Sequence, residues 1–143
     1  MIRPAFNGSV YLGNAGSARD LRRLYDLEIA AVVDLAAEER PAQLGRDLVY
    51  VRVPLHDDGS NPESLLVFAV ESVSLLLRTG RRTLIACSAG MSRSPVIAAA
   101  AIALHTGDAF GDCLVRLTKD GPCDVSPSLA TSVTGILKAM CAG

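Results

Sequence analysis

Residues 84–95 read LIACSAGMSRSP and combine an apolar strand, a loop of small residues and the start of a helix. The apolar run at 83–86 ends at Cys87, and residues 88–92 form a tight loop before Arg93. Ser94 and Pro95 then open an apolar, alanine-rich segment at 96–104 that is too long for a strand. A strand, loop and helix start of this kind turns consecutive backbone N–H groups inward, where they can hold a phosphate-sized anion. We expect Gly90 to adopt a positive φ and Pro95 to lie in the first helical turn.

Two side chains make this loop a candidate reactive site. Cys87 would face loop N–H groups, a helix N-terminus and the Arg93 guanidinium, and all three favour a thiolate. Arg93 can bind two phosphate oxygens with its planar fork. A cysteine after a buried strand is often only a small core residue. Here, however, glycine is third after Cys87 and serine follows Arg93. The pattern therefore predicts a phosphate-transfer site, and it lacks the Gly-Lys-Ser/Thr of a nucleotide-binding loop.

The same residues resemble the His-Cys-x5-Arg-Ser/Thr signature of the cysteine-dependent protein phosphatases, specifically the small, single-domain, atypical dual-specificity phosphatase family. The resemblance covers nearly the whole chain. Residues 10–13 and 31–35 look like that family's first two strands, and residues 50–57, YVRVPLHD, look like the strand and loop that carry its general acid. Two departures stand out: Ala86 replaces the usual histidine, and residues 124–126, DVS, stand where many members carry Pro-Asn. Ala86 can pack but cannot give the loop polar support.

The chemistry needs a proton donor as well as a nucleophile, because thiolate attack on a phosphate ester leaves an alkoxide or phenoxide. Asp57 and Asp58 both follow a predicted strand, and the match to the family pattern favours Asp57. The resemblance also implies that Ser94 helps the thiolate leave during hydrolysis of the phosphocysteine. A helix cap is the alternative role for Ser94. Asp34 is expected to satisfy backbone donors only.

The resemblance implies that the loop between strand and helix binds the phosphoryl oxygens. Its backbone amides and the Arg93 side chain would make the contacts. The residues concerned are Ser88, Ala89, Gly90, Met91, Ser92 and Arg93.

The amino-acid composition indicates a single globular domain and argues against nucleic-acid and membrane partners. With half of its 143 residues apolar but only 4% aromatic, the chain can build one domain whose core is aliphatic. The net charge is −1 and no basic block is present, so we expect no nucleic-acid partner. The longest apolar run, 95–104, is half of the roughly 20 residues that span a bilayer, and no segment resembles a signal peptide, so we expect no membrane partner.

The four cysteines, at positions 87, 113, 123 and 141, show neither metal-ligand spacing nor a secreted disulfide framework. A reducing, cytoplasmic location fits a free Cys87 thiolate. The sequence assigns no role to Cys113, Cys123 or Cys141.

Periodicity and breakers outline the elements. Strands are predicted at 8–13, 29–35, 48–55 and 83–86, and helices at 18–25, 63–78, 94–105, 109–118 and 126–140. Ser17 would cap the first helix, Asn61 and Pro62 would open the second, and residues 36–46 would form a short helix and a loop. The alternation predicts one α/β domain with a largely parallel central sheet flanked by helices on both faces. Cys87 and Asp57 would meet beyond the carboxyl ends of the strands.

The sequence thus predicts a single catalytic phosphatase domain over residues 1–143, of the dual-specificity type. It would hydrolyse phosphotyrosine and/or phosphoserine/threonine esters through a phosphocysteine, with neither metal nor cofactor. Three alternatives stay open: a pseudophosphatase that only binds phosphate, a phosphatase for a non-protein phosphoester such as a phospholipid, sugar phosphate or RNA 5′-phosphate, and a sulfur-transfer or arsenate-reducing enzyme. The acid at Asp57 and the Arg93-Ser94 pair favour the phosphatase.

Overall fold

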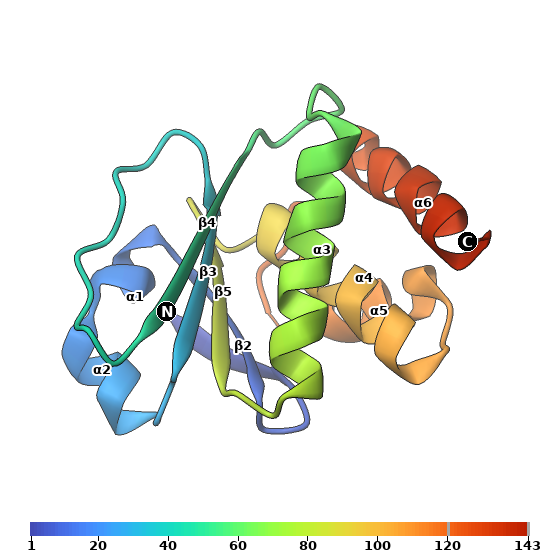
Figure 1. The fold of residues 1–143 in the computed structure, drawn as a ribbon. Coiled ribbons are helices and arrows are strands. Elements are labelled where there is room, and N and C mark those ends of the chain that lie inside the picture. Colours follow the sequence, from blue (N-terminus) through green and yellow to red (C-terminus); the bar gives the residue numbers. More distant parts are fainter. Residues whose placement is uncertain (120, 143) are drawn as a thin grey trace.

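In a computed structural model, which describes residues 1–119 and 121–142, five strands form one sheet in the order β1-β2-β5-β3-β4 (Figure 1). The four strands β2 (Val10–Asn14), β5 (Thr83–Cys87), β3 (Ala31–Ala36) and β4 (Val49–Leu55) are parallel to one another. The edge strand β1 (Ile2–Phe6) pairs antiparallel with β2. The prediction of an α/β fold with a largely parallel sheet is confirmed.

Helices cover both faces of the sheet. The short helices α1 (Ala15–Arg19) and α2 (Leu21–Asp26) lie on one face (Figure 1). On the other face lie α3 (Glu63–Arg78) and α4 (Arg93–Thr106), with α5 (Phe110–Thr118) and α6 (Pro127–Ala142) packed against α4. Helix α4 is buried from Arg93 through Ala103, which explains its uninterrupted apolar sequence.

Alternation along β5 divides the core in two. Leu84 and Ala86 point into the smaller core under α1 and α2, while Ile85 and Cys87 point into the larger core shared with α3 and α4. The side chain of Ala86 is therefore fully buried on the face of the sheet opposite to Cys87. The residue that departs from the family signature thus packs in the core under α1 and α2.

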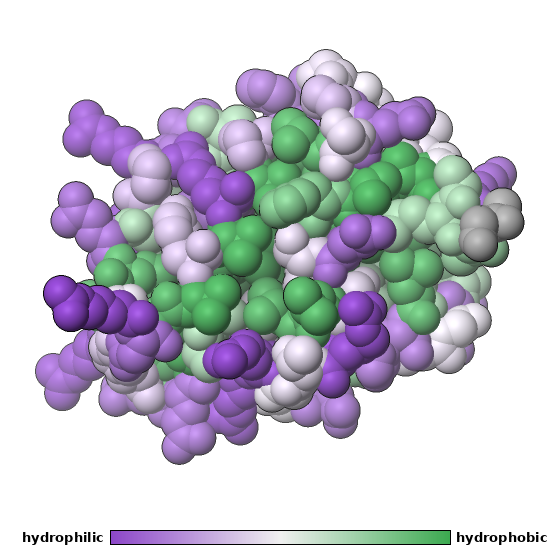
Figure 2. Space-filling model, viewed as in Figure 1, coloured by the Kyte–Doolittle hydropathy of each residue, from purple (hydrophilic) through white to green (hydrophobic). Residues whose placement is uncertain are grey.

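The outer surface of α3 is partly apolar. Figure 2 shows green side chains among purple ones on this face of the molecule, and Phe68 and Leu75 of α3 are both more than half exposed. Among the described residues no helix is both long and apolar enough to cross a membrane.

The N-terminal third departs from the predicted elements. Strand β1 was not predicted, because Pro4 and Arg3 interrupt its apolar pattern at the sheet edge. Asn7 (φ 52°) and Gly8 (φ 67°) form its turn, and an Asn-Gly pair is a strong hairpin signal. The predicted helix at 18–25 with its Ser17 cap is also wrong. Asn14 Oδ1 accepts from Ser17 N at 2.8 Å, and the helix breaks at Asp20, which caps α2 instead.

The short helix predicted within 36–46 does not form. After β3 the chain makes a turn and then runs without regular structure to β4. Arg52 Nη2 donates to three carbonyls of this turn, those of Ala36 (3.3 Å), Ala37 (3.5 Å) and Glu39 (2.7 Å). A side chain of β4 thus holds the turn, and the Ala36 carbonyl also accepts from Glu39 N at 3.4 Å.

Candidate active site

The loop between β5 and α4 takes the predicted shape. Gly90 has φ 75° and Pro95 lies in the first turn of α4, as expected. Gly90 N donates to Cys87 Sγ at 3.2 Å, so one loop amide already points at the sulfur. Cys87 is 2% exposed and ends β5, while Arg93 begins α4. The candidate nucleophile and the candidate phosphate-binding arginine therefore flank one small loop.

The loop backbone is turned with its carbonyls outward. Ala15 N donates to the Ser88 carbonyl at 3.3 Å, and Asp124 N donates to the Met91 carbonyl at 3.0 Å. Within the described part of the chain, nothing accepts from the amides of Ala89, Met91 or Ser92. Ser92 stands at the N-cap of α4 but its side chain makes no cap hydrogen bond. The loop and the helix start thus keep N–H groups free for an anion.

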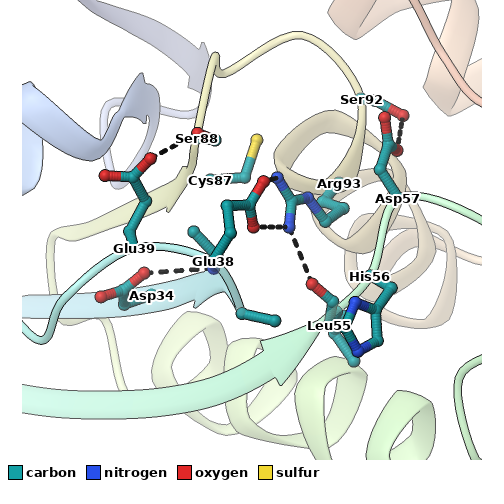
Figure 3. A network of polar contacts seen from close by, with 12 residues as sticks. Asp34, Glu38, Glu39, Leu55, His56, Asp57, Cys87, Ser88, Ser92 and Arg93 are labelled. Carbon is teal, nitrogen blue, oxygen red and sulfur yellow. Dashed lines mark hydrogen bonds and ion pairs between the residues drawn. The ribbon is translucent and has the colours of Figure 1, made fainter.

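Arg93 is 4% exposed, and some but not all of its N–H groups have hydrogen-bond partners. Nη1 donates to Glu38 Oε1 at 2.6 Å and to the Leu55 carbonyl at 2.7 Å, and Nη2 donates to Glu38 Oε2 at 2.7 Å (Figure 3). Within the described residues, Nε is buried without a partner. Five N–H groups minus these three bonds leave Nε–H and one Nη2–H, which lie on the same side of the guanidinium. That side is a free two-pronged donor for two phosphate oxygens.

Glu38 and Glu39 were not singled out from the sequence. Hydrogen bonding to Arg93 lowers the pKa of Glu38 to about 2, so Glu38 is ionised at neutral pH. Glu39 accepts from Ser88 Oγ at 2.7 Å and from Arg19 at 3.1 Å, and these bonds lower its pKa as well. The two glutamates hold opposite ends of the loop, Arg93 and Ser88. The only sequence signal was their place just after β3, because no local motif links them to a loop some 50 residues away.

Asp57 and Asp58 differ in where they point. Asp57 Oδ1 lies 2.5 Å from Ser92 Oγ of the loop (Figure 3). Asp58 accepts from the hydroxyl and the amide of Ser60, and these bonds lower its pKa. A lowered pKa makes Asp58 the poorer proton donor at neutral pH. The geometry therefore favours Asp57 as the acid.

Asn61 has a different role from the predicted helix cap. Its side chain accepts from His56 N at 2.7 Å and donates to the carbonyls of His56 (2.8 Å) and Asp58 (3.2 Å). Pro62 occupies the N-cap of α3 without a side-chain hydrogen bond. The 7%-exposed Asn61 thus closes the loop that carries Asp57. Asp34, as expected, accepts from a backbone amide, that of Ala36, and also from the Tyr50 hydroxyl.

Ser94 makes neither of the two contacts considered for it. Among the described residues its hydroxyl has no hydrogen-bond partner, neither Cys87 Sγ nor a helix amide, although Ser94 is completely buried. A buried hydroxyl without a partner is uncommon in proteins.

A cavity of about 260 Å³ brings the site residues together. Its lining combines the loop with residues from three other segments: Glu38, Asp57, Cys87, Ser88, Ala89, Met91, Ser92, Arg93 and Asp124. Two larger cavities, of about 450 and 370 Å³, lie among α3, α4, α5 and α6 and are lined by neither Cys87 nor Arg93. A further cavity of about 380 Å³ lies beside α1 and has no cysteine in its lining. Of these four cavities in the described part of the chain, the one of about 260 Å³ alone combines a cysteine with an arginine and a carboxyl group.

Residues 10–104 match the family model of the dual specificity phosphatase catalytic domain. The chain belongs to this family. The matched segment runs from β2 into α4 and so contains Asp57 and the whole loop from Cys87 to Arg93.

One curated relative is similar to this chain in sequence, and several solved structures share its fold. Human dual specificity protein phosphatase 15 is 29% identical over 114 residues, which make up 79% of this chain but only 38% of that relative. The crystal structure of human DUSP28 superposes with a TM-score of 0.82 at 19% identity and covers 99% of each chain. PTPMT1 superposes with a TM-score of 0.79 at 17% identity, covering 99% of this chain and 97% of its own. At these identities the two structures show a shared fold.

Proposed function

We propose that residues 1–143 form a single catalytic domain that hydrolyses phosphotyrosine and/or phosphoserine/threonine esters of proteins. The observation that carries this proposal is that Arg93 lines the same cavity as Cys87 and has one edge, Nε–H and one Nη2–H, without a hydrogen-bond partner among the described residues. Burying a donor without a partner costs about 1–3 kcal/mol. A tetrahedral phosphate bound at this edge would satisfy both donors at once.

In the first step, Cys87 Sγ attacks phosphorus and the bond from phosphorus to the ester oxygen breaks. Asp57, on the loop after β4, gives its proton to that oxygen. The Arg93 side chain and the backbone amides of the loop 88–93, of which those of Ala89, Met91 and Ser92 have no acceptor among the described residues, bind the three remaining phosphoryl oxygens. The products are the alcohol or phenol and a phosphocysteine.

In the second step, Asp57 accepts a proton from water as the water oxygen bonds to phosphorus and the S–P bond breaks. Inorganic phosphate leaves and the Cys87 thiolate is restored. Ser94 is proposed to donate a hydrogen bond to the departing sulfur and so to stabilise the thiolate, while keeping its own proton. Neither step uses a metal or a cofactor. Because the chemistry needs a reduced thiol, the cytoplasm is the proposed location.

A non-protein phosphoester is the second candidate substrate. PTPMT1, which shares the fold, has also been crystallised in complex with PI(5)P, at 16% identity to this chain. The cavity here favours a protein substrate, because among the described residues Arg93 alone of its lining is basic, while Glu38, Asp57 and Asp124 are acidic. A lipid headgroup with several phosphates would need further cationic partners.

The test is hydrolysis of p-nitrophenyl phosphate and of a phosphotyrosine peptide in the presence of EDTA. We expect the wild type to be active, Cys87→Ser to be inactive, and Cys141→Ser, a change at an exposed cysteine of α6, to be as active as the wild type. Rapid quenching should trap phosphate on Cys87, identified by mass spectrometry.

Other outcomes would separate the alternatives. Binding of tungstate to the wild type without any turnover would identify a pseudophosphatase. Activity that EDTA removes, or that survives in Cys87→Ser, would overturn the proposed mechanism.

A further inference from the structure

Ser92 uses its hydroxyl in an unexpected way. It is 5% exposed and stands at the N-cap of α4, where a serine ordinarily accepts from the first helical amides. Instead, Ser92 Oγ lies 2.5 Å from Asp57 Oδ1 and accepts from the amide of Ser126 at 2.9 Å. The loop between β5 and α4 is thereby joined to the acid loop after β4 and to the segment that leads into α6.

The two bonds have opposite directions at the Ser92 hydroxyl. The Ser126 amide can only donate, so Ser92 Oγ is the acceptor in that bond. In the other bond the Ser92 hydroxyl donates to Asp57 Oδ1, and an Oδ1 that accepts this proton carries none of its own. The proton that Asp57 delivers in the proposed reaction therefore resides on the other oxygen, Oδ2.

We propose that Ser92 is a positioning residue for the general acid: the relay from the Ser126 amide through the Ser92 hydroxyl to Asp57 Oδ1 presents Asp57 Oδ2 to the leaving group. This inference rests on the proposed phosphatase function. As the P–O bond breaks, the Oδ2–H proton moves to the ester oxygen, and the hydrogen bond from Ser92 stabilises the carboxylate that forms. In the second step Oδ2 accepts the proton from water and the carboxylic acid is restored.

The segment at 121–126 enters this relay through its backbone alone. Ser126 N supports Ser92, and Asp124 N binds the Met91 carbonyl at 3.0 Å. Neither bond uses a side chain of residues 124–126. Residues 124–126, DVS, which stand where many members carry Pro-Asn, therefore support the loop through two backbone amides.

The test compares kcat/KM for an aryl phosphate with a good leaving group, 2,4-dinitrophenyl phosphate, and for phenyl phosphate, which needs the proton. We expect Ser92→Ala to lower kcat/KM for phenyl phosphate by about tenfold to a hundredfold and for the dinitrophenyl ester by less than about threefold. Ser88→Ala removes the other loop hydroxyl, on the Glu39 side, and should affect both esters equally. Ser92→Thr, which keeps the hydroxyl, should restore most of the phenyl phosphate activity.

A double variant locates the effect. In an Asp57→Asn background, Ser92→Ala should cause no further loss on phenyl phosphate, because the residue that it positions no longer donates a proton. Equal losses on both esters, or losses that add to those of Asp57→Asn, would overturn the positioning role while leaving the phosphatase assignment intact. A wild type without phosphocysteine turnover would overturn both. If thermal melts show that Ser92→Ala does not fold, Ser92→Cys under reducing conditions replaces it, since a thiol is a much weaker donor.

Discussion

The Glu38–Arg93 ion pair joins an exposed partner to a buried one. The Arg93 side chain is 5% exposed and that of Glu38 is 55% exposed. Burial alone would lower the pKa of Arg93, but its bonds to Glu38 outweigh that effect and raise it. By binding Nη1 and one side of Nη2, Glu38 fixes the plane of the guanidinium and leaves the Nε edge without a partner among the described residues. In the proposed function, Glu38 would therefore position Arg93 for the phosphate.

Replacing Glu38 with glutamine should destabilise the protein in a pH-dependent way. Folding lowers the pKa of Glu38 from 4.5 to about 2, so the ion pair contributes stability above about pH 4.5 and loses it as the pH falls toward 2. Because Glu38 is half exposed, we expect Glu38→Gln to lower the free energy of unfolding by only about 1 kcal/mol at pH 7. Urea unfolding of both proteins at pH 7, 4 and 3 measures the difference. A difference that stays constant down to pH 3 would show that the charge on Glu38 is not what Arg93 requires.

The catalytic role proposed for Ser94 can be tested separately from its effect on the stability of the protein. Its buried hydroxyl has no partner among the described residues, so Ser94→Ala removes an unsatisfied group and should leave the free energy of unfolding unchanged or raise it by about 1 kcal/mol. If Ser94 assists thiolate departure, the same variant should release a burst of alcohol and accumulate phosphocysteine. Denaturant unfolding and rapid-quench kinetics measure the two effects. Equal slowing of the burst and the steady state would remove Ser94 from the second step.

At the level of elements, the loop between β5 and α4 depends on a close approach to β2. Gly90 has φ 75°, and a Cβ at this position would lie 2.8 Å from the Gly13 carbonyl oxygen and 2.8 Å from Met1 Cε. Gly80 has a similar φ of 72° but has nothing within 4 Å of such a Cβ. Comparing an alanine substitution at each position therefore distinguishes the cost of a positive φ from the cost of a steric clash.

We expect Gly80→Ala to cost about 1 kcal/mol of unfolding free energy, from its positive φ alone, and to leave activity unchanged. Gly90→Ala should cost about 2–4 kcal/mol, because the Gly13 backbone cannot move aside as a flexible side chain can. It should also reduce kcat/KM by at least about tenfold, since the loop amides would be displaced. Urea unfolding and steady-state kinetics on both variants provide the measurements. Similar costs at the two sites would mean that contact with β2 does not shape the loop.

The sequence predicted those elements whose pattern is local. The strands β3, β4 and β5 and the helices α3 to α6 follow from apolar runs and periodicity, and their observed bounds lie within two residues of the predicted ones. The hairpin at Asn7 and Gly8 was also readable, but its flanking strand is short and contains a proline. The turn after β3 was not readable, because Arg52 shapes it from 13 to 16 residues away.

In the candidate site, too, the residues with a local sequence pattern could be predicted and their long-range partners could not. Cys87, Arg93 and Asp57 belong to recognisable local patterns, and the fold brings all three to one cavity. The supports of these residues could not be predicted, since Glu38 contacts Arg93 across 55 residues and Ser126 contacts Ser92 across 34. Asn61 carried a cap signal, yet its side chain closes the acid loop. Polar residues near an element end have several possible partners, and only the folded chain selects one.

For the molecule as a whole, the parallel sheet determines what the cavity contains. The strands β3, β4 and β5 end at the same edge, and the residues that follow them supply Glu38, Asp57 and the loop from Cys87 to Arg93. Glu38 is neutralised by Arg93, and Asp57 carries its proton when it acts as the acid, so the exposed Asp124 is the remaining negative charge at the cavity mouth. Asp124 has no cationic partner within the described residues.

This charge distribution predicts a preference among phosphopeptides. At about 8 Å in water, each opposite-charge pair contributes about 0.5 kcal/mol, and like charges cost as much. We therefore expect a phosphotyrosine peptide flanked by arginines to have a kcat/KM roughly five- to tenfold above that of the same peptide flanked by glutamates, at low salt. The ratio should fall toward about twofold at 0.5 M salt, because the Debye length becomes shorter than the separation of the charges. Asp124→Asn should reduce the ratio without changing turnover of an uncharged aryl phosphate. A preference for the acidic peptide, or faster turnover of PI(5)P in vesicles than of either peptide, would contradict the assignment of a protein substrate.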